Sequence, residues 1–248
     1  MKRLLALALI VAAAVSCHDE SKSILVLTER GGIHEPFVEA GLYWLDSLSS
    51  AENYKLTVIN DTESMTHQSL RTFDLILQLN YPPYMWTEEA SASFIDYIEE
   101  GWGAWIGFHH ASLLGEFDGY PMWEWASEFL GNIVYENYIP ELSDGEVRVE
   151  APNHPIMQGV PASFIIYDDE WYIYNRSPRN DVTVLAHVDE DSYTADTKVK
   201  MGDHPVIWTN PDVAARNVYF QMGHSPKLFD NGNFTRMLEN AIAWSLDE

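Results

Sequence analysis

The sequence predicts an α/β fold, a three-layer sandwich in which helices cover both faces of a mostly parallel, open sheet. Short, continuously apolar runs recur along the chain, and longer runs with helical spacing of apolar residues separate the first of them. Strands that are apolar on both faces are typical of parallel sheets covered by helices. No long linker, low-complexity stretch or internal repeat interrupts residues 24–248, which we interpret as one domain.

The first half of this domain supplies the alternating elements. Strands are expected at 23–27, 55–59, 74–79 and 104–108. Helical spacing follows from Phe37 to Leu48, and a second helix is expected from Thr87, its N-cap, as far as Gly101.

The second half is richer in strands. These are expected at 146–150, 164–167, 182–188, 206–208 and 217–222. An amphipathic helix at 234–246 closes the chain, and Gly232-Asn233 provides its start.

The N-terminus has the pattern of a bacterial lipoprotein signal. The apolar run from Leu4 to Val15 is shorter than the roughly 20 residues of a bilayer-spanning helix and fits a signal peptide that ends in small residues. Cys17 follows directly and, as the only cysteine, cannot form an intrachain disulfide. We expect residues 1–16 to be removed, Cys17 to be lipidated and residues 17–23 to form a tether. Ordinary signal cleavage is the alternative.

The charge balance excludes one class of partner. The formal net charge of −24 becomes −26 when the signal is removed with Lys2 and Arg3. A surface that binds nucleic acid needs clustered basic residues, and the 14 in this chain are scattered. We therefore expect no nucleic-acid partner, and contact with the membrane only through the N-terminal lipid.

Three histidines each follow a predicted strand. His34 comes after the first strand, His109 after the fourth and His224 after the last. Ligands of open α/β sheets bind at the carboxyl ends of the strands, so we expect these side chains to converge there. Histidine suits proton transfer near neutral pH and is a common metal ligand. A surface or structural position is the competing interpretation for each histidine taken alone.

Two familiar kinds of site are not expected. Gly31 and Gly32 allow a sharp turn in the first loop, but no Lys-Ser/Thr pair and no extended glycine fingerprint follows, so we expect no nucleotide cofactor. Because Cys17 is the only cysteine, the domain has no thiol for cysteine-based amide hydrolysis. Ser112 lacks the flanking glycines of a nucleophile elbow.

Six motifs carry a resemblance that spans nearly the whole mature chain. They are GGIH at 31–34, GWGAWIGFH at 101–109, HPI at 154–156, DEWY at 169–172, PVIW at 205–208 and RNVYFQMGH at 216–224. In their order and spacing they resemble the ThuA-like, or trehalose-utilisation, family. That family is related to the class I glutamine amidotransferase-like fold, so the resemblance implies a flavodoxin-like sandwich with an open sheet.

The resemblance also implies roles. In the amidotransferase relatives, a cysteine follows the strand that corresponds to 104–108 and a histidine follows the one that corresponds to 217–222. His109 thus takes the nucleophile's place and His224 that of the triad histidine, while Ser225-Pro226 replaces the acid expected next. The family's association with disaccharides and glycosides implies a small-molecule carbohydrate as ligand and sugar oxidoreductases as partners in the same pathway.

Carboxylates beside aromatic residues complete the predicted site. The run from Asp168 to Glu170 precedes Trp171 and Tyr172. Such runs are usually solvated, but a carboxylate in a cleft can orient a histidine or bind sugar hydroxyls, and we favour Glu170. The residues expected to be catalytic are His109, His224 and Glu170. Those expected to contact substrate are Gly32, His34, Glu35, Asp169, Trp171 and Tyr172.

The sequence therefore predicts a lipoprotein of the bacterial cell envelope, on the periplasmic side or the outer surface. We expect an enzyme, a hydrolase or lyase with histidine acid/base chemistry, acting on a glycoside or a 3-keto sugar. A variant places a divalent metal such as zinc on His34, His109 and His224, because three imidazoles with an open position make a catalytic zinc site. The alternative function is non-catalytic carbohydrate binding through Trp and Tyr side chains.

Overall fold

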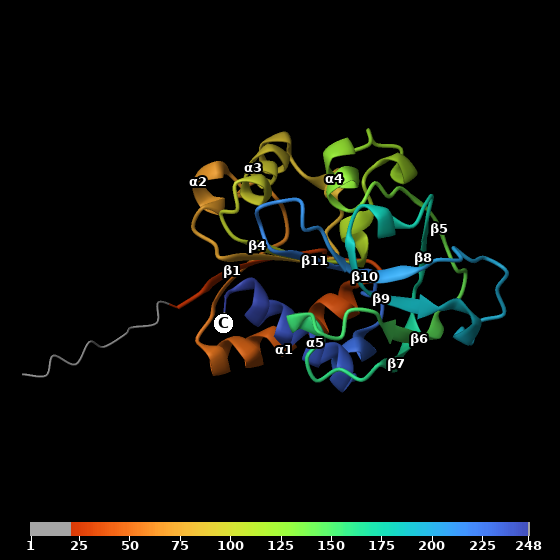
Figure 1. Ribbon diagram of the computed structural model, residues 1–248. Coiled ribbons are helices and arrows are strands. Elements are labelled where there is room, and N and C mark those ends of the chain that lie inside the picture. Colours follow the sequence, from red (N-terminus) through yellow and green to blue (C-terminus); the bar gives the residue numbers. More distant parts are fainter. Residues whose placement is uncertain (1–20, 248) are drawn as a thin grey trace, which may run out of the picture.

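A computed structural model describes residues 21–247, so Cys17 and the expected signal at 1–16 lie outside the described residues. The domain is a three-layer sandwich whose helices lie on both faces of one sheet (Figure 1). One face carries α1 (Glu35–Glu52) and α5 (Gly232–Ser245), and the other carries α2 (His67–Leu70), α3 (Glu88–Glu99) and α4 (Glu124–Phe129). Within residues 21–247, no helix is both long and apolar enough to cross a membrane.

The middle layer is a nine-stranded sheet with the order β2-β1-β3-β4-β11-β10-β9-β6-β7. Its strands are β1 (Ser23–Thr28), β2 (Lys55–Ile59), β3 (Leu75–Leu79), β4 (Ala104–Phe108), β6 (Ser143–Val149), β7 (Ser163–Asp169), β9 (Thr183–Asp189), β10 (Pro205–Thr209) and β11 (Asn217–Phe220). The first five strands in the sheet pair in parallel, and the later pairings are antiparallel, so only β10 and β6 run against the others. The predicted α/β fold with a mostly parallel central sheet is confirmed.

The apolar strands are buried on both faces, as their sequences require. In β1, Ile24 and Val26 pack into the core beneath α1 and α5, whereas Leu25 and Leu27 pack into the core beneath α3. Side chains of a strand alternate between its two faces, so an unbroken apolar run buries both.

The helices begin where local chemistry satisfies their free N–H groups. Thr87 caps α3, because its side-chain oxygen accepts a hydrogen bond from the Ala90 N–H at 3.2 Å. Asn231 caps α5 by accepting from the N–H of Asn233 at 3.0 Å. The predicted N-cap of α3 and the predicted start of α5 are both confirmed.

A second sheet and two short helices escaped the sequence-based expectations. The small antiparallel sheet pairs β5 (Tyr135–Tyr138) with β8 (Tyr172–Tyr174). Strands of three or four residues are too short for a recognisable period, and the same holds for the helices α2 and α4, which have four and six residues. This sheet bears on the site, because β8 carries Tyr172 beside the carboxylates at 169–170.

Candidate metal centre

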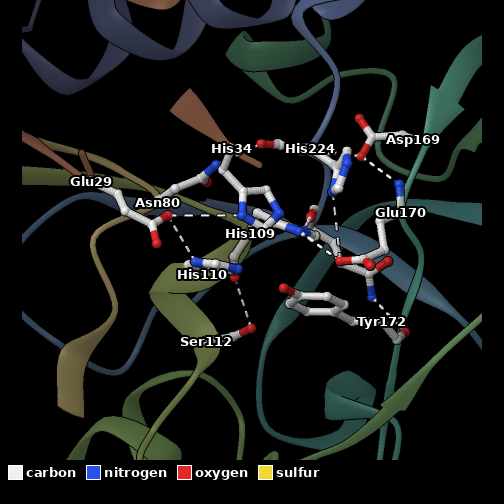
Figure 2. Close-up of polar contacts among 12 residues, drawn as sticks. Glu29, His34, Asn80, His109, His110, Ser112, Asp169, Glu170, Tyr172 and His224 are labelled. Atoms are coloured by element: carbon white, nitrogen blue, oxygen red, sulfur yellow. Dashed lines mark hydrogen bonds and ion pairs between the residues drawn. The ribbon is translucent and has the colours of Figure 1, made fainter. Parts of the chain in front are cut away.

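Four of the residues predicted to belong to the functional site bring their side chains together at the carboxyl edge of the sheet (Figure 2). His34, His109, Glu170 and His224 each offer a donor atom, and these atoms all lie within 4.8 Å of one another. The ring centroid of His34 is 5.1 Å from that of His109 and 4.5 Å from that of His224. The structure thus brings together the three histidines and the carboxylate that the sequence singled out.

Local structure aims two of these histidines into the cluster. The carbonyl oxygen of His34 accepts hydrogen bonds from the N–H groups of Phe37 and Val38, while its side chain takes no part in capping α1. His109 directly follows β4 and has φ +43°, a left-handed conformation that costs a non-glycine residue about 1–3 kcal/mol. Gly223 leaves room for it, since a Cβ at position 223 would lie 2.7 Å from the His109 Cβ.

The hydrogen bonds of His109 fix its tautomer. Its Nδ1 lies 2.9 Å from the carbonyl oxygen of Gln221, which can only accept, so Nδ1 carries the proton. Its Nε2 lies 3.1 Å from Oε2 of Glu170. Burial lowers the pKa of His109 to about 4, although Glu170 raises it. The neutral ring therefore turns a lone pair towards a carboxylate, and a cation, either a proton or a metal, is needed between them.

His34 also presents a free lone pair. Burial, together with the neighbouring histidines, lowers the pKa of His34 to about 2, so the ring is neutral at ordinary pH. Its Nε2 is buried and has no hydrogen-bond partner among residues 21–247. Neutral imidazoles with unshared lone pairs are the form of histidine that binds metals.

Glu170 supplies the negative charge of the cluster. Burial raises its pKa, but the contacts of its Oε2 with His109 at 3.1 Å and with His224 at 3.8 Å outweigh burial and hold the pKa well below its usual range. For His224, burial lowers the pKa while Glu170, whose Oε2 lies 3.8 Å from Nδ1, raises it, and the net shift is upward. The carboxylate is thus ionised beside two neutral rings and one more basic ring.

The position of Asp169 differs from the one predicted for it. The sequence suggested that it contacts substrate, but its side chain is fully buried. Its Oδ1 accepts hydrogen bonds from the backbone N–H of Glu170 at 2.7 Å and of His224 at 3.1 Å. Burial raises the pKa of Asp169 to about 7 against these hydrogen bonds. The carboxyl group therefore ties together the two chain segments that carry Glu170 and His224.

Trp171 and Tyr172, also expected to contact substrate, are buried as well. The indole N–H of Trp171 donates to the Ser143 carbonyl oxygen at 2.9 Å inside the core. The Tyr172 ring stacks on the His109 ring with centroids 4.0 Å apart. Large rings fill the space behind the cluster, so neither presents a surface to a ligand. Gly32 is exposed in the loop before His34, and Glu35 opens α1.

Two residues beside the cluster were missed by sequence reasoning. Oε2 of Glu29 lies 2.9 Å from Nδ1 of His110, and the His110 ring is 4.0 Å from the His34 ring, centroid to centroid (Figure 2). Both residues lie just past strand ends, Glu29 as the first residue after β1 and His110 as the second residue after β4. The rule that placed His34 and His109 at the carboxyl edge would have found them too.

Comparison with known proteins identifies relatives along almost the entire domain. A family model described as "ThuA: Trehalose utilisation" matches residues 23–245. A ThuA-like protein from Bacteroides uniformis is 28% identical, with a TM-score of 0.81 over 91% of this chain and 92% of that one. A ThuA-like protein from Parabacteroides merdae is 13% identical, with a TM-score of 0.63 over 92% and 90%. A β-galactosidase from Bacillus circulans shares the fold at 13% identity and a TM-score of 0.53, over 88% of this chain and 31% of that one. No curated protein matches this chain significantly.

Proposed function

The chain belongs to the ThuA family, described as trehalose utilisation, and we propose that it is a divalent-metal-dependent enzyme that acts on a small carbohydrate, a glycoside or a 3-keto sugar. One observation carries the proposal. Three imidazoles and a carboxylate, from four separate segments of the chain, place their donor atoms within 4.8 Å of one another. Buried polar groups gathered in this way need a common partner.

The donor set fits a divalent cation. His109, His224 and Glu170 would bind it, with His34 in reach as a further donor. Two histidines with one carboxylate, or three histidines, are the protein ligands of many catalytic zinc and iron sites. When bound, such a cation acts as a Lewis acid on a substrate oxygen. A proton held between His109 and Glu170 is the metal-free alternative, in which histidine acid/base chemistry operates alone.

The residues around the donors preorganise them. The Gln221 carbonyl oxygen holds the His109 ring so that Nε2 faces Glu170, and the ring of Tyr172 packs flat against His109. Asp169 fixes the backbones of Glu170 and His224. A donor set supported in this way needs little rearrangement when a cation binds.

Exposed aromatic rings near the cluster support a carbohydrate as substrate. Tyr120 is 52% exposed and stacks on Tyr84, with centroids 4.9 Å apart and planes inclined by 18°. Tyr84 lies in the turn Pro83–Met85, which contacts the turn His109–Ser112. Tyrosine combines an apolar face with a polar tip, which suits sugar rings. The same surface supports the second candidate, carbohydrate binding without catalysis.

One experiment separates these candidates. The protein is incubated with trehalose, other disaccharides and their 3-keto derivatives, and products are followed by NMR, with and without a chelator. We expect turnover that the chelator abolishes, that added Zn²⁺ or Mn²⁺ restores, and that Glu170→Gln removes. Turnover that is insensitive to the chelator favours acid/base chemistry alone. Binding without turnover, unaffected by His109→Ala and Glu170→Gln, would leave only the binding role.

The cellular location is a second part of the proposal. We propose that Cys17 anchors the protein by lipid in the cell envelope, on the basis of the signal pattern before it. The wild type should partition into detergent and fractionate with membranes. Cys17→Ala should abolish both properties, and an unchanged membrane fraction in that variant would refute the lipid anchor.

A further inference from the structure

A second group of metal-binding side chains lies directly beside the first. Glu29, His34 and His110 also place one donor atom each within 4.8 Å of the others. Glu29 and His34 lie in the loop between β1 and α1, and His110 lies in the turn after β4, so two segments of the chain converge here. Figure 2 shows Glu29 and His110 on the side of His34 away from Glu170.

The contacts within this group are close but are not hydrogen bonds. Oε2 of Glu29 is 2.9 Å from Nδ1 of His110 and 4.0 Å from Nδ1 of His34. Even so, Oε2 of Glu29 and Nδ1 of His110 are both buried and make no properly directed hydrogen bond with any described residue. Atoms that lie this close without pointing at each other are arranged like two ligands of one cation. A buried carboxylate oxygen otherwise requires a partner.

The six donor residues divide into two sets of three. His34 belongs to both groups of donors, and assigning it to Glu29 and His110 leaves His109, His224 and Glu170 as the other set. Each set then contains two imidazoles and one carboxylate, a ligand set that leaves coordination positions open for substrate. The sets adjoin, since the His109 and His110 rings are 5.2 Å apart and the His34 and His224 rings 4.5 Å apart, centroid to centroid.

We propose that the site binds two divalent cations, one on Glu29, His34 and His110 and the other on Glu170, His109 and His224. This proposal rests on the proposed function, because it requires that Glu170, His109 and His224 bind a metal. Paired cations act together on one substrate, each binding a different oxygen of the reacting group. Glycosides and keto sugars offer neighbouring oxygens of this kind.

Metal counting tests the proposal without a known substrate. The full chain, kept in detergent and stripped of metal, is loaded with Zn²⁺, separated from free metal by gel filtration and analysed for zinc per chain. We expect two zinc ions in the wild type and one each in Glu29→Gln, His110→Gln and Glu170→Gln. Glu39→Gln, at an exposed position on α1, serves as the matched control and should retain two. Circular dichroism establishes that each variant is folded.

The other outcomes are distinguishable. One zinc ion in the wild type, unchanged in Glu29→Gln and His110→Gln, would overturn the second site and leave the proposed function standing. Two ions in both of these variants would place the second ion elsewhere and overturn the assignment. No zinc in the wild type would overturn both proposals. With Mn²⁺ instead, neighbouring ions should give a spin-coupled electron paramagnetic resonance spectrum, and a spectrum of isolated ions in the wild type would contradict the pairing.

Discussion

Nε2 of His109 lies 3.1 Å from Oε2 of Glu170, and it presents a lone pair because the other ring nitrogen donates to a backbone carbonyl oxygen. Two acceptors face each other across a normal hydrogen-bond distance in a buried place. A cation between them turns this repulsive arrangement into an attractive one.

Glu170→Gln removes the charge while preserving the shape of the side chain. We expect the dissociation constant for Zn²⁺ to rise more than about 10-fold, because even residues that only support metal ligands change affinity by 10-fold to 100-fold. Competition with a chromophoric chelator measures it, with Glu39→Gln as the charge-matched control on the surface of α1. Equal affinities in the two variants would exclude Glu170 as a ligand.

Gly223→Ala tests the packing behind His109. The new methyl group would lie 2.7 Å from the His109 Cβ and 3.0 Å from Oδ1 of Asn80, so His109 must shift. We expect a loss of about 1–3 kcal/mol in the free energy of unfolding together with weaker metal binding. Gly232→Ala is the control, since a Cβ there meets nothing within 4 Å. Denaturant titration of both variants makes the comparison, and equal stabilities would contradict the crowding.

Tyr219→Phe tests a buried hydroxyl that supports the turn carrying His109. This hydroxyl lies 2.9 Å from the His109 carbonyl oxygen and 2.9 Å from Oγ of Ser112. Its removal takes one hydrogen bond from each of these buried groups, although the His109 carbonyl oxygen still accepts from Ser112 Oγ, and Ser112 Oγ still contacts the Tyr174 hydroxyl. The free energy of unfolding should therefore fall by about 1 kcal/mol. Tyr43→Phe, at a position that is 80% exposed, should change it little. A neutral Tyr219→Phe would mean that the turn does not depend on this hydroxyl.

Glu190→Gln should show a defined pH dependence. Oε1 of Glu190 is 2.9 Å from Nδ1 of His204 and accepts from the Met201 N–H at 2.6 Å. Burial raises the pKa of Glu190, but these contacts outweigh burial and hold the pKa below its usual value. The carboxylate therefore stabilises the fold above its unfolded pKa of about 4.3, and this contribution is lost as pH falls through the lower folded pKa.

Unfolding curves at pH 7 and below pH 4 measure this effect. The wild type should exceed Glu190→Gln by about 1–3 kcal/mol at pH 7, and the difference should shrink in acid. Asp191→Asn, whose side chain is 88% exposed, should stay within about 0.5 kcal/mol of the wild type at both values. A difference between wild type and Glu190→Gln that does not vary with pH would contradict the assigned pKa shift.

The sequence was most informative where chemistry follows strand ends. Continuous apolar runs predicted the parallel strands, and the rule that ligands gather at their carboxyl ends predicted that His34, His109 and His224 converge. The same rule covers Glu29 and His110, whose part in the site depends on the contact between them across two loops, which no local motif encodes.

Other features depend on contacts between distant segments and leave little trace in the sequence. Asp169 lies in a run of acidic residues whose composition predicts exposure to solvent. It is nevertheless buried, where its Oδ1 accepts a hydrogen bond from the backbone N–H of His224, 55 residues later. Trp171 beside a carboxylate suggested a sugar platform, but its ring fills the core. Local composition does not tell which face of a short strand such as β8 is covered.

Anomalous diffraction from crystals grown with Zn²⁺ shows whether a metal ion binds between His109 and Glu170. Data collected on both sides of the zinc absorption edge locate every bound ion. We expect a peak about 2.0–2.2 Å from Nε2 of His109 and from a carboxylate oxygen of Glu170, and its loss in Glu170→Gln. A wild-type map with no peak among these side chains, at zinc concentrations that saturate the protein, would contradict a metal centre at this site.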